Sequence, residues 1–360
     1  MKKIFFCLVA VTLIFGCATP KKDVLDEAIF YPPLPNQPRL QYLMSISNED
    51  DLKGGQSSFE EFLVGKQTSE KDIGRPYAFG SVKGKIYVVD REYKSIIVLD
   101  LENAEFDFVK AKGLGTIYDP GGIWVTEDNY KYVADFGRQQ ILVFDKEEKF
   151  VRSYGEPGQL DRPLDVAVYE SNIYVCDFDK HQIVVFDKES GEIINTIGTA
   201  GQEDGEFLKP THITIGQWGD LYVMDAFNFR VQKFDAGGQY ISTIGGHGDG
   251  PGAFARPKGI SVDQEANLYA VDIAFENVQI FDDKTGKLLL YFGGYGNSPG
   301  NMYLPTGIHI YYENVDYFKK YADKNFRIKY VLYVANSLGR AKVNVYAFGE
   351  WIGPPLPEMK

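Results

Sequence analysis

Short apolar runs recur along most of the chain and predict β-strands rather than helices. Runs such as Ile183-Val-Val-Phe186 are apolar on successive residues, which is typical of strands that are covered on both faces. Turn-forming residues separate the runs, and apolar residues at helical spacing are almost absent. We therefore expect a chain built from many short strands, and helical solenoids are excluded.

Six segments repeat one layout: a proline, a short strand, a turn, a second strand that ends in an acid or amide, and a third strand. Successive prolines are 44, 43, 47, 47 and 48 residues apart. Such a period indicates that one supersecondary unit is repeated and stacked. The repeat prolines are Pro76, Pro120, Pro163, Pro210, Pro257 and Pro305. The second strands end at Asp90, Asp135, Asp177, Asp225, Asp272 and Asn336.

Each unit reads as a four-stranded antiparallel sheet whose two faces are too apolar to stand alone, so radial stacking would bury them. The fourth unit runs Leu221-Tyr-Val-Met-Asp225, then Asn228, then Arg230-Val-Gln-Lys-Phe-Asp235. This pattern resembles NHL repeats, and the resemblance covers about residues 75–349. It implies an all-β fold, a six-bladed β-propeller. The family includes binding modules, scaffolds and a few lyases, so the resemblance does not choose a function.

The ends of the repeat region predict how the ring closes and where it is decorated. Residues 39–47 alternate like a strand, and we expect them to supply the outer strand of blade six. The propeller would then span residues 39–350, with a tail at 351–360. Blade six also carries an insertion at about 313–329, where Val315, Phe318 and Ala322 have helical spacing. It is expected to form either a short helix over one face or a loop that plugs the ring.

The N-terminus has the features of an export signal. Lys2 and Lys3 precede an apolar run over residues 4–15, which is too short to span a bilayer but long enough for a signal-peptide core. The run ends in Ile14-Phe15-Gly16-Cys17, which resembles the lipobox of bacterial lipoproteins. That resemblance implies removal of residues 1–16 and lipidation (acylation, as by palmitate) of Cys17. The alternative is an ordinary secretory signal.

The segment after Cys17 and the cysteine count fit an anchored, exported protein. Residues 17–38 are rich in proline and are expected to form a semi-rigid spacer. Ala18, rather than an acid, follows Cys17, which by analogy with sorting in enteric bacteria favours the outer membrane. Apart from Cys7 and Cys17, Cys176 is the one remaining cysteine, so we expect no internal disulfide. Cys176 lies in a strand and is expected to be an inert core thiol.

The charge balance limits the class of partner. The net charge is −12, and removing residues 1–16 takes away two lysines and no acids, which makes it −14. A strongly acidic chain is a poor match for nucleic acid, whose phosphates need clustered cations. On net charge alone, basic or neutral partners are favoured.

Two sets of residues are candidates for binding. One aromatic residue follows the second strand in each of five units, and all five should meet on one face of the ring, where they would either bind a ligand or pack against neighbouring loops. These rim aromatics are Tyr93, Phe136, Phe178, Phe227 and Phe275. The acids that end the second strands could form a cation-binding ring, but their repetition favours a structural role in which they bind turn amides.

The third candidate breaks the repeat. Two residues after the repeat proline, where other units have Ala or Gly, two units have Asp165 and His212; His309 lies further along its own inner strand. These three side chains could converge in the channel on a metal such as zinc or calcium. Peptidylglycine amidating lyases and streptogramin B lyases, which are propellers of related type, have channel histidines.

The sequence thus favours a membrane-anchored binding or assembly scaffold of the bacterial cell envelope, without a cofactor, that takes a protein, peptide or glycan. The alternative is a metal-dependent lyase or hydrolase with its site in the channel at Asp165, His212 and His309.

Overall fold

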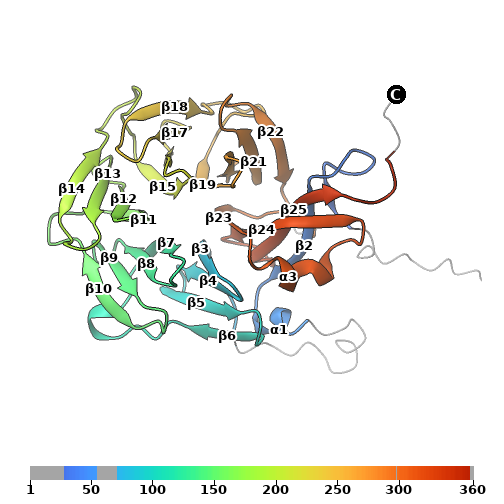
Figure 1. Cartoon of the computed structure of the whole chain (residues 1–360), viewed down its shortest axis with the longest axis horizontal. Helices are drawn as coiled ribbons and strands as arrows, with labels where there is room; N and C mark the ends of the chain where they lie inside the picture. Colours follow the sequence, from blue (N-terminus) through green and yellow to red (C-terminus); the bar gives the residue numbers. More distant parts are fainter. Residues whose placement is uncertain (1–27, 55–70, 297, 357–360) are drawn as a thin grey trace, which may run out of the picture.

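The computed structural model describes residues 28–54 and 71–356 except residue 297. Six antiparallel sheets are arranged as blades around a common centre (Figure 1). Five blades have four strands, and the sixth has five. The predicted all-β, six-bladed propeller is therefore confirmed. Each of the six repeat prolines begins the innermost strand of its blade.

In blades one to five, the strands follow one another in sequence from the centre of the ring to its rim. Blade one contains β3 (Pro76–Val82), β4 (Lys85–Asp90), β5 (Ser95–Asp100) and β6 (Glu105–Phe108). Blade two contains β7 (Pro120–Val125), β8 (Lys131–Asp135), β9 (Gln140–Phe144) and β10 (Phe150–Tyr154). Blade three contains β11 (Pro163–Tyr169), β12 (Asn172–Asp177), β13 (Gln182–Asp187) and β14 (Ile193–Ile197).

The remaining blades continue the ring. Blade four contains β15 (Pro210–Ile215), β16 (Leu221–Asp225), β17 (Arg230–Phe234) and β18 (Tyr240–Ile244). Blade five contains β19 (Pro257–Val262), β20 (Asn267–Asp272), β21 (Asn277–Asp282) and β22 (Leu288–Gly293). Blade six contains β23 (Pro305–Tyr311), β24 (Phe326–Asn336), β25 (Val343–Trp351), β2 (Leu40–Ile46) and β1 (Phe30–Tyr31), in that order outward.

The hydrophobic core consists of six clusters, each lying between two adjacent blades. The second strand of blade three shows why its sequence is apolar on successive residues. Ile173 and Val175 face blade two, whereas Tyr174 and Cys176 face blade four. Both faces of each sheet are thus covered, as the runs of apolar residues predicted. Because Cys176 is fully buried in such a cluster, burial raises the pKa of its thiol, which keeps it unreactive.

The N-terminal strand closes the ring as predicted. β2 pairs antiparallel with β25, so residues distant in sequence form one sheet, and Leu40 is fully buried against Phe348 and its neighbours. The expected spacer reached Pro38, but within that range Phe30 and Tyr31 form β1, which adds a fifth strand outside β2. Phe30 is buried beside Phe326 and Trp351, and this apolar contact accounts for the extra strand.

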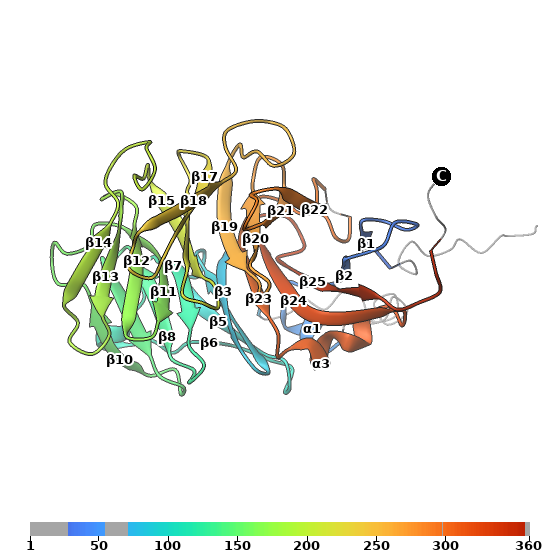
Figure 2. The ribbon, with the colours of Figure 1, turned by 45° about the horizontal axis from the view of Figure 1, so that its top comes forward.

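The insertion in blade six contains the predicted short helix, α3 (Val315–Phe318), followed by the 3-10 turn η2 (Lys319–Tyr321). Phe318 is fully buried in the cluster between blades six and one, which fixes the helix there. The Tyr317 hydroxyl donates to the Leu52 carbonyl at the end of α1 (Glu49–Leu52), and α1 and α3 lie near each other in Figure 2. Among the described residues, no helix has both the length and the apolar character needed to cross a membrane.

Candidate functional site: the crossover face and the channel

One face of the propeller gathers the segments that the sequence singled out. In every blade the repeat proline at the start of the innermost strand pairs with the residue that ends the second strand, as Pro76 does with Asp90. The crossovers between blades and the loops after the second strands therefore lie at the same ends of the sheets. We call this side the crossover face.

The strand-ending acids stabilise the crossover face and do not form an open cation site. They are completely buried and accept hydrogen bonds from backbone amides of the preceding crossover. Asp90 accepts from the amides of Gly74 and Arg75, and Asp135 accepts from those of Tyr118 and Asp119. The corresponding acids of blades three to five bind crossover amides in the same way. The structural interpretation of these acids is confirmed.

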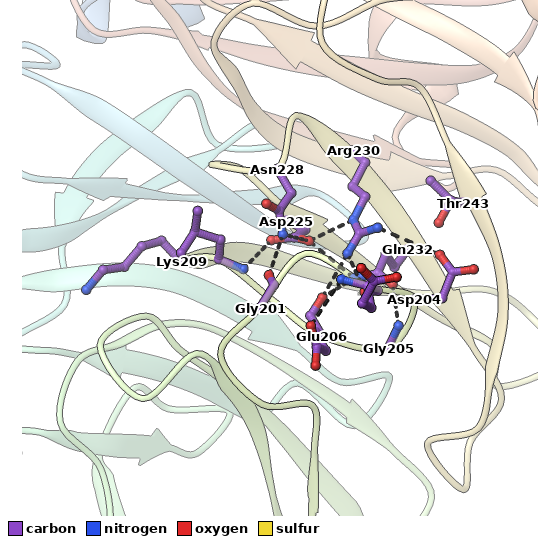
Figure 3. A network of polar contacts seen from close by, with 12 residues as sticks. Gly201, Asp204, Gly205, Glu206, Lys209, Asp225, Asn228, Arg230, Gln232 and Thr243 are labelled. Atoms are coloured by element: carbon purple, nitrogen blue, oxygen red, sulfur yellow. Dashed lines mark hydrogen bonds and ion pairs between the residues drawn. The ribbon is translucent and has the colours of Figure 1, made fainter.

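Blade four extends this arrangement into a larger polar network (Figure 3). Arg230 Nε lies 2.9 Å from Asp225 Oδ2, and the Arg230 side chain is only 11% exposed. Asn228 and Gln232 also donate to the same carboxylate oxygen. Burial raises the pKa of Asp225, while the hydrogen bonds, led by the amide of Leu208, oppose that shift. A buried carboxylate and a buried guanidinium thus balance each other.

The five rim aromatics all come from the crossover face, but the structure brings only part of them together. Phe227 is 57% exposed and meets Phe178 edge-on at 6.2 Å between ring centroids, and Phe136 lies near this pair. Tyr93 is 43% exposed but lies further out, where its ring packs on Phe108 and its hydroxyl donates to Asp72. Phe275 lines a separate hollow of about 170 Å³ beside blade five.

Cationic side chains lie between these rings, a feature that sequence reasoning missed. The Arg91 guanidinium lies 4.9 Å from the Tyr77 ring centroid and 5.0 Å from that of Phe136. Arg162 lies 5.4 Å from Phe136 and 5.1 Å from Phe178, whose ring is 4.7 Å from Lys209 Nζ. Such contacts contribute about 0.5–1 kcal/mol each when exposed. We call this series the basic–aromatic row: Tyr77, Arg91, Phe136, Arg162, Phe178 and Lys209.

A signal for these cations was present in the sequence. Four of the six residues that precede a repeat proline are basic, although a turn before a proline does not require a positive charge. The six are Arg75, Asp119, Arg162, Lys209, Arg256 and Leu304. Because each crossover delivers this position to the same face, the basic residues form an arc around the mouth of the channel.

The channel is closed at this mouth by an aromatic side chain. Tyr77 follows the first repeat proline, is 7% exposed, and stacks on His212 with ring centroids 5.5 Å apart. The two residues come from blades one and four, which face each other across a ring of six. The inner strands enclose a cavity of about 50 Å³, lined by Asp165, His212 and His309 among others. Such a volume has room for only a few water molecules.

Asp165 has a structural role in the channel. One carboxylate oxygen accepts from its neighbour's amide, Val166, and the other accepts from the Ile213 amide of blade four at 3.0 Å. Burial raises the pKa of Asp165 to about 7, although both hydrogen bonds oppose the shift. A Cβ at Gly122 would lie 1.6 Å from this carboxylate, so the acid fills the space that a side chain in blade two would need.

The two channel histidines are buried as neutral bases. Burial lowers the pKa of His212 to about 3, helped by the positive charges of Lys258 and Arg91, and lowers that of His309 to about 4. Both ring nitrogens of His212 and Nε2 of His309 lack hydrogen-bond partners among the described residues. His309 stacks instead against Tyr311 and Tyr333.

The metal hypothesis for Asp165, His212 and His309 needs correction. Within the described chain, no three or more His, Cys, Asp or Glu side chains are grouped so that they could hold a metal ion. All three residues line the cavity, but Asp165 is committed to backbone amides and His212 to Tyr77. Their places on the innermost strands brought them to the channel without grouping their donor atoms around one metal ion, so no zinc or calcium chemistry is derived from them.

Comparisons with known proteins support the fold. A family model described as 6-bladed beta-propeller (DUF5128) matches residues 159–237 and 217–291, which lie in blades three to five. A structure of a protein of unknown function from Bacteroides thetaiotaomicron is 16% identical, with a TM-score of 0.56 over 78% of this chain and 71% of that chain. Virginiamycin B lyase from Staphylococcus aureus is 14% identical, with a TM-score of 0.52 over 76% of this chain and 95% of that chain. At these identities the likeness shows the architecture alone.

Proposed function

We propose that this protein is a non-catalytic binding or assembly scaffold, lipid-anchored in the bacterial cell envelope, that takes a protein, peptide or glycan on its crossover face. The observation that carries the proposal is the clustering of rim aromatics from neighbouring blades, with Phe227 more than half exposed and in contact with Phe178. Exposed aromatic side chains beside cations are typical of the residues that anchor a partner at an interface.

The state of the channel supports binding on the face over chemistry inside the ring. Tyr77 covers the mouth by stacking on His212, and the cavity beneath it has a volume of about 50 Å³. Small-molecule sites in proteins usually have several hundred cubic ångströms, roughly 300–1,000 Å³. A partner that rests on the face needs no such volume, because it contacts the rims of several blades at once.

The place of the N-terminal strands supports the proposed anchoring. β1 is the outermost strand of blade six, so the chain enters the propeller at the edge of the disc. An anchor attached there would leave the crossover face accessible. Cys17 lies outside the described residues, and its lipidation, like placement at the outer membrane, is proposed from the sequence around it.

Site-specific photocrosslinking in cells would test the binding face. A crosslinking amino acid replaces Phe227 on the crossover face or, as a control, Trp218, which is 66% exposed in the loop between β15 and β16 on the opposite face. We expect a discrete adduct from position 227 and none of the same size from position 218. Equal adducts from both positions, or none from 227, would contradict the proposal.

Membrane fractionation would test the anchor separately. The Cys17→Ser variant removes the thiol that would carry the lipid, and we expect the protein to leave the membrane fraction. A Cys176→Ser variant is the matched control, because that thiol lies in the core between blades three and four. Unchanged membrane association of Cys17→Ser would refute lipid anchoring.

A further inference from the structure

Four cations gather around the channel mouth on the crossover face without neutralising partners. Arg91 and Arg162 belong to the basic–aromatic row, Arg256 precedes the repeat proline of blade five, and Lys258 directly follows it. We call Arg91, Arg162, Arg256 and Lys258 the mouth cations. Lys258 occupies the repeat position at which blade one places Tyr77, the second residue of the innermost strand.

The side chains of the mouth cations form no ion pair and no hydrogen bond with other described residues. Two other basic residues on this face do have ion-pair partners: Lys209 lies 2.6 Å from Asp179, and Lys94 lies 2.8 Å from Asp119. The aromatic rings beside Arg91 and Arg162 orient the guanidiniums but carry no net charge. The strand-ending acids beneath the mouth bind backbone amides, including those of Arg162 and Arg256, so the cationic side chains themselves have no carboxylate within ion-pair distance among the described residues.

The mouth cations also repel one another. Burial lowers the pKa of Lys258, and the nearby charges of Arg256 and Arg91 lower it further. The charges of Lys258 and Arg91 likewise lower the pKa of His212. In a chain whose net charge is −12, four cationic side chains without ion-pair partners among the described residues thus lie close to this one mouth. Like charges held together at a partly desolvated place favour an anion that would neutralise them.

We propose that the mouth cations bind the carboxylates of an acidic polypeptide segment of a partner protein. This inference rests on the proposed function and names the chemistry of its partner. The cations are spread over blades one, three and five, and two of them, Arg91 and Arg162, alternate with the rings of Tyr77, Phe136 and Phe178. A single small anion would reach only part of this set. An extended segment can place several carboxylates on the cations and its apolar groups on the rings.

Fluorescence anisotropy with a labelled oligoglutamate peptide would test the inference, using the full chain in detergent. We expect saturable binding that weakens with added salt and that an oligoglutamine peptide does not show. The double variant Arg256→Gln/Lys258→Gln should weaken binding about tenfold or more, because it removes two of the four positive charges that would bind the carboxylates.

The matched control is Lys284→Gln/Lys287→Gln, which removes the same charge from exposed positions in the loop between β21 and β22 on the opposite face. It should bind oligoglutamate like the unaltered chain. Equal weakening in both double variants, or absence of oligoglutamate binding, would overturn the inference. Binding to phosphatidylglycerol vesicles that is lost in Arg256→Gln/Lys258→Gln, without binding to oligoglutamate, would also overturn the inference, in favour of a lipid surface.

The two proposals can fail separately. If position 227 still crosslinks to a discrete partner while oligoglutamate does not bind, the binding face stands and the acidic partner is wrong. If position 227 gives no adduct while oligoglutamate binds through the mouth cations, the acidic site stands without the proposed scaffold function.

Discussion

Tyr77 and His212 stack across the channel of the propeller, with ring centroids 5.5 Å apart, although 135 positions separate them in the sequence. The contact links two opposite blades and covers the mouth of the channel. It also keeps His212 away from water, which is the main reason that its pKa is lowered to about 3.

Replacing Tyr77 with alanine should therefore both destabilise the protein and change the titration of His212. Loss of a large buried aromatic side chain costs about 3–5 kcal/mol of unfolding free energy. The pKa of His212 should rise towards 6.5 as water enters, which NMR titration of the imidazole would measure. Tyr93→Ala, at an exposed rim position, is the control and should change the unfolding free energy by less than about 1 kcal/mol. An unmoved His212 pKa would contradict the covering role.

His212 should make stability depend on pH in the acid range. Its folded pKa of about 3 lies below the ordinary 6.5, so the unfolded chain takes up a proton first and stability is lost as pH falls below about 6.5. Each such proton contributes a slope of about 1.4 kcal/mol per pH unit. His212→Phe should reduce the slope of unfolding free energy between pH about 4.5 and 6 by that amount in urea titrations. An unchanged slope would show that His212 is protonated in the folded state.

Asp165 should make stability fall as the pH rises, which is opposite to the effect of His212. Its folded pKa of about 7 lies above the ordinary 3.8, so its contribution is fully present below about pH 4 and is lost as pH rises through 7. Asp165→Asn removes this opposing contribution, so stability should rise more steeply with pH, by about 1.4 kcal/mol per pH unit between pH about 4.5 and 6. The same urea titrations would measure it; an unchanged slope would indicate that Asp165 is ionised in the folded state.

Replacing the buried acids that end the second strands should lower the free energy of unfolding by different amounts in different blades. Asp225→Ala removes the acceptor of the Arg230, Asn228 and Gln232 side chains and of the Leu208 amide, and Arg230 keeps only its longer pairing with Asp204 and two carbonyl acceptors. At about 1 kcal/mol per lost hydrogen bond, the cost should be about 3–5 kcal/mol of unfolding free energy. Asp135→Ala leaves only uncharged backbone amides without an acceptor, so about 1–3 kcal/mol is expected. Urea unfolding of the two variants would compare them. A larger loss of unfolding free energy for Asp135→Ala would contradict the stabilising role of the polar network around Asp225 (Figure 3).

The sequence predicted those features of the fold that repeat or alternate locally. The repeat prolines and strand-ending acids located every blade, and the alternation over residues 39–47 located the closing strand. β1 escaped prediction because its burial depends on Phe326 and Trp351, which are distant in sequence.

The candidate site was harder to predict because it depends on contacts between blades. The rim aromatics were correctly placed on one face, but their spacing from Arg91 and Arg162 is set by neighbouring blades. The metal hypothesis rested on three residues of innermost strands, and a place on such a strand brings a residue to the channel but does not orient its donor atoms. Asp165 was instead bound by the Ile213 amide, a contact that no local pattern indicates.

One measurement tests most directly whether a partner binds on the crossover face or in the channel. It is the yield of the photocrosslinked adduct from position 227, compared between two further variants. Phe178→Ala removes a ring that contacts Phe227, whereas His309→Ala alters the channel lining and leaves the rim unchanged. If the crossover face is the binding surface, Phe178→Ala lowers the yield several-fold and His309→Ala leaves it unchanged. A yield that falls with His309→Ala but not with Phe178→Ala would contradict binding on the face and place the partner in the channel.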